Sequence, residues 1–141
     1  MTRIDAAIAV VARDGKVLIC QRRDDDDALP GYWEFPGGKC EDGETLEQCL
    51  LRELREEVNI DARPIVPLPP IEHEYPHALI RLHPFLCAHS HGEPQLLECQ
   101  RAIWIEPHEL RTYRFPPANG ELIERVIEHF RANPSRALGE R

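Results

Sequence analysis

The chain has 141 residues, of which 42% are hydrophobic and 30% are charged, and its formal net charge is −8. This length and composition predict one soluble domain with a single core, and they argue against disorder. The negative charge argues against long DNA or RNA as a partner, because a surface that binds nucleic acid is normally basic. A small anionic substrate is compatible with this charge if metal ions supply positive charge.

Hydropathy and cysteine usage indicate the compartment. No apolar run approaches the roughly 20 residues that a membrane span needs, so we expect no membrane partner. The apolar stretch near the N-terminus contains a charged residue and no cleavage-like site, so we interpret it as a strand and not as a signal peptide. The five cysteines include no CxxC pair, which argues against a disulfide framework or a zinc site. We therefore expect a cytoplasmic protein, and we favour a monomer over a homodimer.

Apolar runs and turn signals predict the elements of the N-terminal half. In order, these are a buried strand at 4–12, a hairpin turn at Asp14–Gly15, a strand at 16–23, a loop at 24–31, a short strand at 32–35 and a glycine-containing loop at 36–39. A helix follows at 45–58, because leucines recur there every four residues. Asn59 stands where a left-handed C-terminal cap is expected.

The C-terminal half predicts further strands and one more helix. In order, we expect a proline-rich connection around a short strand at 61–70, a kink at Pro76 followed by a strand, a hairpin turn at 90–94, a strand at 101–105, a one-turn helix at 107–110 and a last helix at 120–132. Residues 1–132 are thus one domain, and 133–141 are a frayed tail. Strands interleaved with two helices predict an α+β fold, arranged as an α/β/α sandwich with a mixed sheet.

The end of the first predicted helix carries an electrostatically unfavourable cluster. Glu53 lies three and four residues before Glu56 and Glu57, so the three carboxylates share one helical face. Like charges at this spacing cost roughly 0.2–0.5 kcal/mol per pair. A hard divalent cation such as Mg²⁺ offsets this cost, since it binds carboxylates together with substrate phosphates. For a glutamate pair in isolation, a solvated acidic face is the simpler interpretation.

The residues around this cluster suit the same chemistry. Arg52 lies four residues before Glu56 and can pair with it. Glu44 precedes the helix and stabilises the positive end of its dipole. The adjacent glycines at 37–38 let the backbone approach a ligand closely, and Lys39 offers a mobile positive charge to phosphate.

The segment 37–60, GGKCEDGETLEQCLLRELREEVNI, is similar to the Nudix box, the signature of Nudix hydrolases. The chain has Asn59 where the family pattern has glycine, at a helix cap where asparagine is tolerated. The resemblance implies a Nudix-type fold and a cofactor of Mg²⁺, with Mn²⁺ as a substitute. It implies metal ligands at Glu53, Glu56 and Glu57, with the Gly37 carbonyl.

The resemblance extends over most of the chain. The segments ICQRR, WEFPGGK, EYP, HGEP and FPPAN occur in the order seen in the MutT subfamily, the 8-oxo-dGTP diphosphatases. These enzymes hydrolyse oxidised guanine nucleoside triphosphates to the monophosphate and pyrophosphate, which keeps the damaged base out of DNA. Glu98 matches an acidic residue that assists metal binding or catalysis in that subfamily; its simpler interpretation is a surface glutamate. The implied catalytic set is Glu44, Arg52, Glu53 and Glu98.

The implied substrate residues are Arg23, Phe35, Gly38, Lys39 and Asn119. Asn119 matches the MutT asparagine that recognises the purine edge, because an amide donates and accepts at once; it also stands where an N-cap of the last helix is expected. Phe35 either forms a wall of the base site or belongs to the core. Arg23 either reaches the nucleotide or pairs with the neighbouring aspartates.

Three positions depart from the MutT pattern. Tyr75, His77 and Ala78 occupy a stretch where MutT has a phenylalanine and an Asp-Arg pair. This leaves a second substrate hypothesis open, in which the same chemistry acts on CTP or an oxidised pyrimidine triphosphate. A third hypothesis is a catalytically silent Nudix-fold binding module. The complete set of glutamates argues against the silent module, which has no need to retain them.

Overall fold

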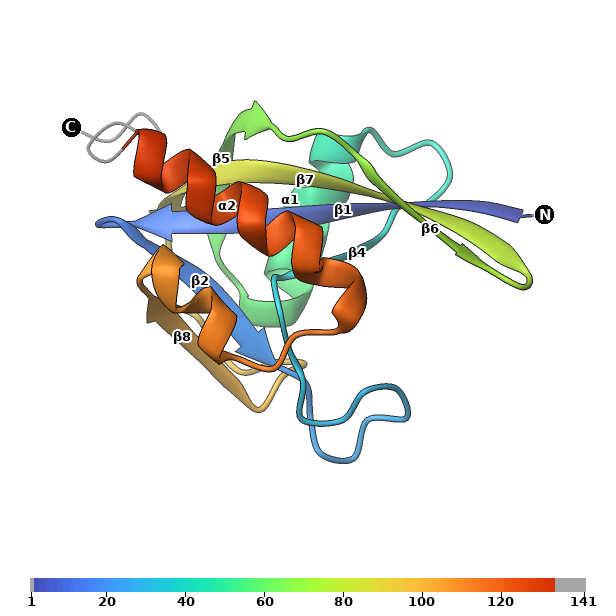
Figure 1. Ribbon diagram of the computed structural model, residues 1–141, viewed down its shortest axis with the longest axis horizontal. Coiled ribbons are helices and arrows are strands. Elements are labelled where there is room, and N and C mark those ends of the chain that lie inside the picture. The colour runs from blue at the N-terminus through green and yellow to red at the C-terminus, as the bar shows by residue number, and fades with distance from the viewer. Residues whose placement is uncertain (1, 134–141) are drawn as a thin grey trace.

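The computed structural model describes residues 2–133, which form one mixed sheet with helices on both faces (Figure 1). The strands are β1 (Thr2–Arg13), β2 (Lys16–Gln21), β3 (Trp33–Glu34), β4 (Gly37–Lys39), β5 (Asp61–Pro67), β6 (Ile71–Tyr75), β7 (Ala78–His91) and β8 (Arg101–Ile105). The helices are α1 (Leu46–Val58) and α2 (Gly120–Ala132), with 3₁₀ turns η1 (Pro107–Thr112) and η2 (Pro117–Asn119).

The sheet is built around β1. Its main path runs β3-β2-β1-β7-β5, and β4, β6 and β8 pair with β1, β7 and β2 respectively. β1 and β7 are parallel along almost their whole length, whereas the other strand pairs are antiparallel. The predicted mixed sheet is therefore confirmed.

Two hydrophobic cores lie on opposite faces of β1, because successive side chains of a strand point to opposite faces. Ala7, Ala9 and Val11 pack in the core that includes the buried residues of α1. Val10 and Ala12 pack in the core that includes the buried residues of α2. In Figure 1, α2 lies in front of the sheet and α1 behind it. The expected α/β/α sandwich is confirmed.

The partners of β1 differ between its two ends. Its C-terminal end pairs with β2, at Ala12 and Arg13, whereas its middle residues Ala6–Ile8 pair with β4. The glycine segment, expected to be a loop, is therefore partly a strand. Gly37 allows β4 to approach β1 closely. Its φ is +153°, and a Cβ at this position would lie 2.3 Å from the Ala7 carbonyl oxygen. Only glycine fits this conformation and this approach.

Two turn predictions need correction. Pro76 does not kink a strand but stands in the turn of a hairpin, in which β6 and β7 are antiparallel. The segment 90–94 was expected to be a hairpin turn, and this is wrong, because β8 pairs with β2 and not with β7. The chain after β7 instead returns to the end of α1, where the Gln95 N–H donates to the Val58 carbonyl over 2.9 Å.

The ends of α1 follow the sequence closely. Thr45 is the N-cap and forms a reciprocal capping box with Gln48, so the helix begins one residue later than expected. Asn59 adopts the left-handed conformation, with φ 53° and ψ 48°, as predicted for the C-cap. The hairpin turn at Asp14–Gly15 has positive φ at both residues, and α2 spans the predicted 120–132. Of the expected tail, 134–141 lie outside the described residues.

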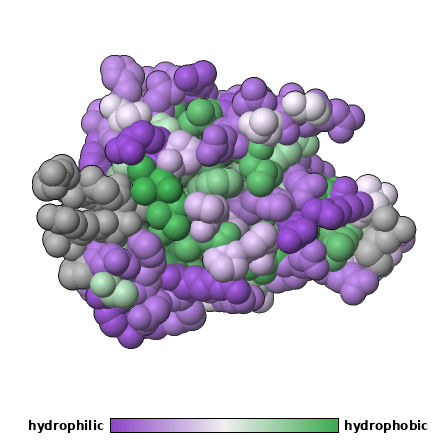
Figure 2. All heavy atoms as spheres, turned by 90° about the horizontal axis from the view of Figure 1, so that it is seen from above, coloured by the Kyte–Doolittle hydropathy of each residue, from purple (hydrophilic) through white to green (hydrophobic). Residues whose placement is uncertain are grey.

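The outer surface is largely hydrophilic. Seen from above the view of Figure 1, hydrophobic residues gather in a band between hydrophilic margins (Figure 2). No helix within residues 2–133 is long and apolar enough to cross a membrane.

Candidate active site

Helix α1 directs its carboxylates toward β4 because its leucine face is packed against the sheet. Leu50, Leu54 and Val58 have no exposed surface. Glu57 lies beside that face and retains 8% exposure, which makes it the one buried charged residue in the described part of the chain. One oxygen of Glu57 accepts a hydrogen bond from the Gly37 N–H at 3.2 Å. The helix and the glycine strand thus meet at a buried carboxyl group.

The surroundings of Glu57 disfavour its charged form. Burial, a hydrogen bond with the Glu53 carboxyl and the negative charge of Glu34 together raise the pKa of Glu57 to about 10. Burial likewise raises the pKa of Glu34, although its partner Arg22, at 2.9 Å, opposes that change. Glu57 therefore keeps its proton at neutral pH, and a cation bound between α1 and β4 would favour the loss of that proton.

Arg52 holds the remaining glutamates in fixed positions. Its guanidinium donates two hydrogen bonds to Glu44, at 2.6 and 3.0 Å, which lower the pKa of Glu44 to about 2. The same side chain donates to Glu53 at 2.9 Å and to Glu56 at 3.2 Å. The pairing of Arg52 with Glu56 predicted from their spacing is confirmed, and Glu44 is tied to the cluster through Arg52.

Gly38 lies directly against the Glu53 carboxyl group, so a larger residue at this position would force the Glu53 side chain to move. A Cβ at Gly38 would lie 2.6 Å from the carboxyl carbon of Glu53, closer than real Cβ contacts allow. The carboxylate therefore rests against bare backbone. This is the close backbone approach that the paired glycines predict.

The donor set fits a hard divalent cation. Glu57 is buried beside Glu53 with no cationic side chain paired to it among the described residues, and carboxylate oxygens are the ligands that Mg²⁺ prefers. No three His, Cys, Asp or Glu side chains in residues 2–133 already stand in a metal-binding arrangement. Glu53 and Glu56 instead share Arg52. A bound cation would favour the charged form of the buried Glu57 carboxyl group, which has no paired cationic side chain among the described residues.

A cavity of about 320 Å³ adjoins this cluster on the α2 face of the sheet. Its lining includes the backbone of two glycines and several polar and aromatic side chains: Gly37, Gly38, Arg22, Glu34, Phe35, Lys39, His73, Tyr75 and Asn119. Phe35 combines its two interpretations, since it lines the cavity and also packs in the core against Phe115, with ring centroids 5.3 Å apart. Four of the five expected substrate residues lie in this cavity; Arg23 does not.

Asn119 stands immediately before α2 but does not cap it. Its φ and ψ are −91° and 1°, and its side chain forms no capping hydrogen bond. The capping interpretation is therefore wrong for the side chain. Asn119 reaches the cavity from η2, which leaves its amide available to a ligand.

Arg23 and its neighbour Arg22 point to different places. Arg23 pairs with Asp25 at 3.2 Å and is largely exposed, in a surface hollow separate from the cavity. This is the aspartate pairing that the sequence left open. Arg22 lines the cavity and pairs with Glu34 there. Neither Arg22 nor Glu34 was among the expected site residues, although Arg22 lies within the motif ICQRR and Glu34 within WEF.

Glu98 lies on the segment that returns to α1. Its side chain is exposed, and its backbone N–H and that of Leu97 approach the Glu57 carbonyl oxygen at 3.4 and 3.2 Å. The structure thus brings the backbone of this segment to the acidic cluster. Among the described residues, the Glu98 side chain forms no hydrogen bond with the glutamates of α1.

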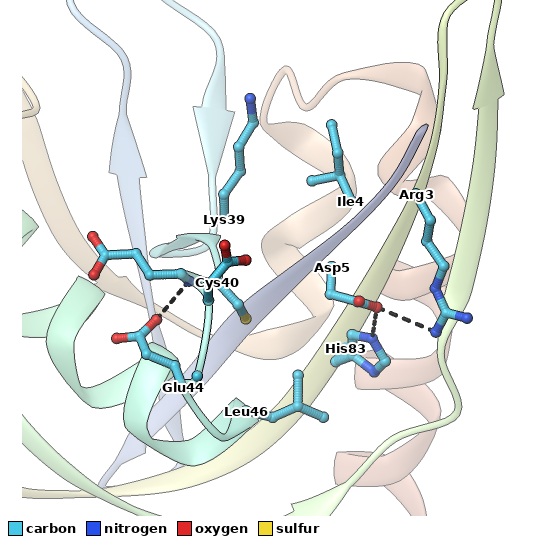
Figure 3. Close-up of a pocket in the computed structure, with 11 residues that line it drawn as sticks. Arg3, Ile4, Asp5, Lys39, Cys40, Glu44, Leu46 and His83 are labelled. Carbon is cyan, nitrogen blue, oxygen red and sulfur yellow. Dashed lines mark hydrogen bonds and ion pairs between the residues drawn. The ribbon is translucent and has the colours of Figure 1, made fainter. Parts of the chain in front are cut away.

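A second cavity, of about 670 Å³, lies on the other side of β1 (Figure 3). Asp5 accepts hydrogen bonds there from Arg3 at 3.4 Å and from the His83 ring at 2.8 Å. Figure 3 shows the Lys39 side chain pointing away from Glu44. Lys39 lines both cavities, so its positive charge lies between the two sides of β1.

Comparison with known proteins defines the class to which this fold and site belong. The model of the NUDIX domain matches residues 6–125, and the chain belongs to that family. It is a Nudix hydrolase, an enzyme that acts on phosphoanhydride bonds, and Nudix hydrolases generally use a divalent metal. The predicted family, fold class and enzyme class are confirmed.

Individual relatives are similar over nearly their full length. The chain is 36% identical to the CTP pyrophosphohydrolase of Escherichia coli K12, over 96% of this chain and 99% of the relative. It is 38% identical to the 8-oxo-dGTP diphosphatase of Haemophilus influenzae, over 88% and 91%. The solution structure of the E. coli ORF135 protein superposes with a TM-score of 0.82, at 37% identity and 96% coverage of both chains.

Proposed function

We propose that this protein is a Mg²⁺-dependent nucleoside triphosphate pyrophosphohydrolase of MutT type. It hydrolyses 8-oxo-dGTP or a related oxidised nucleotide to the monophosphate and pyrophosphate, which clears the nucleotide pool of damaged precursors and avoids mutation. The similarity to 8-oxo-dGTP diphosphatases of H. influenzae and E. coli supports this substrate.

One observation carries the proposal: the cavity and the acidic cluster share a wall. Gly37 and Gly38 line the cavity, and the same glycines contact Glu57 and Glu53. A base held in the cavity leaves its phosphates at this wall, beside the carboxylates and Lys39. The enzyme therefore recognises the nucleoside on one side of β4 and performs hydrolysis on the other.

The reaction adds water to one phosphoanhydride bond. An oxygen–phosphorus bond forms to the water, the bridging bond breaks, and pyrophosphate leaves while a carboxylate of the cluster takes the proton. Arg52 keeps Glu53 and Glu56 oriented, and Glu44 in turn orients Arg52. Lys39 offsets the negative charge of the phosphates.

The metal ligands that we propose are the Gly37 carbonyl and the carboxylates of Glu53, Glu56, Glu57 and Glu98. When bound, Mg²⁺ supplies positive charge to the phosphate oxygens and lowers the pKa of a bound water, and Mn²⁺ serves as a substitute. The raised pKa of Glu57 is consistent with a group that loses its proton when a cation arrives.

A second substrate has a specific observation in its favour. The E. coli CTP pyrophosphohydrolase matches almost the whole chain, so CTP or an oxidised pyrimidine triphosphate is the alternative substrate. Profiling pyrophosphate release from a panel of normal and oxidised triphosphates separates the two. Our account expects the highest kcat/KM for 8-oxo-dGTP; a higher value for CTP favours the alternative, and no hydrolysis of any triphosphate favours a silent module.

The wider setting that we propose is a cytoplasmic monomer. Residues 1–132 form its single domain and 133–141 its tail. Its substrate is a small nucleotide, and neither long nucleic acid nor a membrane is a partner, in line with a net charge of −8.

A further inference from the structure

His73 has a fixed ring that no role described above requires. It lies on β6, lines the cavity and forms a 2.9 Å hydrogen bond between its Nε2 and the Ala118 carbonyl oxygen. A carbonyl oxygen only accepts hydrogen bonds, so Nε2 carries the proton. The bond joins β6 to the turn η2 and holds the ring beside Asn119.

The other ring nitrogen of His73 is left available. With Nε2 protonated, Nδ1 of the neutral ring is an acceptor. No hydrogen bond or ion pair joins it to another described residue. Within residues 2–133, the one fully buried side-chain nitrogen or oxygen without a partner is Nε of Arg81, so Nδ1 of His73 retains access to solvent. An accessible acceptor on a cavity wall can bind a ligand.

Asn119 offers a second set of polar groups at the same wall. Its amide does not cap α2, and it supplies one acceptor oxygen and an N–H donor. Together, His73 and Asn119 present two acceptors and one donor group to the cavity. The walls around them are apolar, with Phe35, Ile80 and Leu82 among the lining residues.

We infer that His73 is a specificity-determining residue, and that with Asn119 it selects a guanine-type base over cytosine. Guanine places an N–H, an amino group and a carbonyl oxygen side by side, which matches two acceptors and one donor. Cytosine has a single amino donor beside two acceptors, so one acceptor of the pair would face another acceptor. This inference deepens the proposed nucleotide function and rests on it.

The test is binding of nucleoside monophosphates without metal, so that the base and not the hydrolysis is measured. Calorimetric titration with dGMP and with dCMP compares the wild type with His73→Phe and His73→Gln. We expect His73→Phe to weaken dGMP binding roughly tenfold and dCMP binding less than twofold, because one paired hydrogen bond is lost. His73→Gln should restore most of the preference, since its amide can donate to the Ala118 carbonyl and still accept from the base.

A matched control is His77→Phe. His77 is exposed in the turn of the same hairpin and does not line the cavity, so its replacement should leave both affinities unchanged. Equal binding of dGMP and dCMP by the wild type, or an unchanged ratio in His73→Phe, would overturn the inference.

A measurement on the wild type covers the case in which His73→Phe does not fold. The ¹⁵N resonance of His73 Nδ1 should shift on saturation with dGMP and stay in place with dCMP; an unmoved resonance with dGMP contradicts the inference. Either negative result leaves the proposed hydrolysis intact. That function fails separately, if the wild type releases no pyrophosphate from any triphosphate with Mg²⁺.

Discussion

Among the carboxyl groups of the described residues, Glu57 is buried and has a strongly raised pKa. Its pKa is raised from an ordinary value of 4.5 to about 10, so the metal-free protein holds a proton there at neutral pH. Between these two values the native state binds a proton that the unfolded state has released. This residue's contribution to the free energy of unfolding therefore falls as pH rises through that window.

We predict that Glu57→Gln flattens this pH dependence, because the amide is isosteric with the protonated acid and does not titrate. Melting temperatures of metal-free protein at about pH 5 and about pH 9 measure the effect. The wild type should lose several degrees more than the variant over this interval. Glu47→Gln, at an exposed position of the same helix, should behave like the wild type. Equal slopes for the wild type and Glu57→Gln would contradict the account.

Glu53→Gln tests the chemistry at nearly constant shape. The change removes one ligand charge and should lower kcat roughly 10²–10⁴-fold through lost transition-state stabilisation. The folded state should persist, which circular dichroism and a melting curve can check. Activity within threefold of the wild type on the best triphosphate would show that the metal assignment of Glu53 is wrong.

Residue types at fixed spacing were the most predictable part of the site. The three glutamates, Arg52 and the paired glycines follow from positions along one helix and one strand, where local geometry fixes the neighbours. Arg22 and His73 could not be found this way, because their partners Glu34 and Ala118 lie 12 and 45 residues away. Such contacts exist only after the strands and turns have come together.

At the scale of elements, α1 is defined by its two caps. Asn59 closes it in the left-handed conformation at φ 53°, which alanine adopts only at a cost of roughly 1–2 kcal/mol. We predict that Asn59→Ala lowers the free energy of unfolding by about 1 kcal/mol, whereas Asn59→Gly leaves it unchanged or raises it slightly. Urea denaturation of both variants measures this. Equal stability of Asn59→Ala and the wild type would show that the cap contributes nothing.

The turn η2 allows a separate prediction about Asn119, which lines the cavity and forms no side-chain capping hydrogen bond with α2. Asn119→Ala should raise KM for 8-oxo-dGTP far more than for dGTP, by roughly 5- to 150-fold, and leave the melting temperature unchanged. Asn119→Asp should lose discrimination as well, since it lacks the amide donor. Unchanged discrimination in both variants would remove Asn119 from base recognition.

The helices and the strand at 101–105 were predictable because their signals are local. Two segments were not. The pairing of Gly37–Lys39 with β1 depends on a glycine fitting against the Ala7 carbonyl, and composition alone made that segment look like a loop. The segment after β7 resembles a hairpin turn, but its backbone is bound by the carbonyls of Glu57 and Val58 at the end of α1.

At the scale of the whole molecule, β1 pairs with two different strands along one edge. We propose that this arrangement lets one sheet support both base recognition and hydrolysis. β2 and β4 pair with different parts of the same edge of β1. The glycines of β4 line the cavity and also lie against Glu57 and Glu53 of α1. The cavity that we propose for the nucleoside lies on the α2 face, while α1 brings the carboxylates and Arg52 from the other face. Lys39 borders cavities on both sides, which places its charge where we expect phosphates.

The most direct test of this account is product analysis of 8-oxo-dGTP hydrolysis by the full chain, with Mg²⁺ and with excess EDTA. We predict one pyrophosphate and one 8-oxo-dGMP per turnover with Mg²⁺, no product in EDTA, and recovery when Mg²⁺ or Mn²⁺ is restored. Undiminished hydrolysis in EDTA, or release of orthophosphate in place of pyrophosphate, would contradict the account.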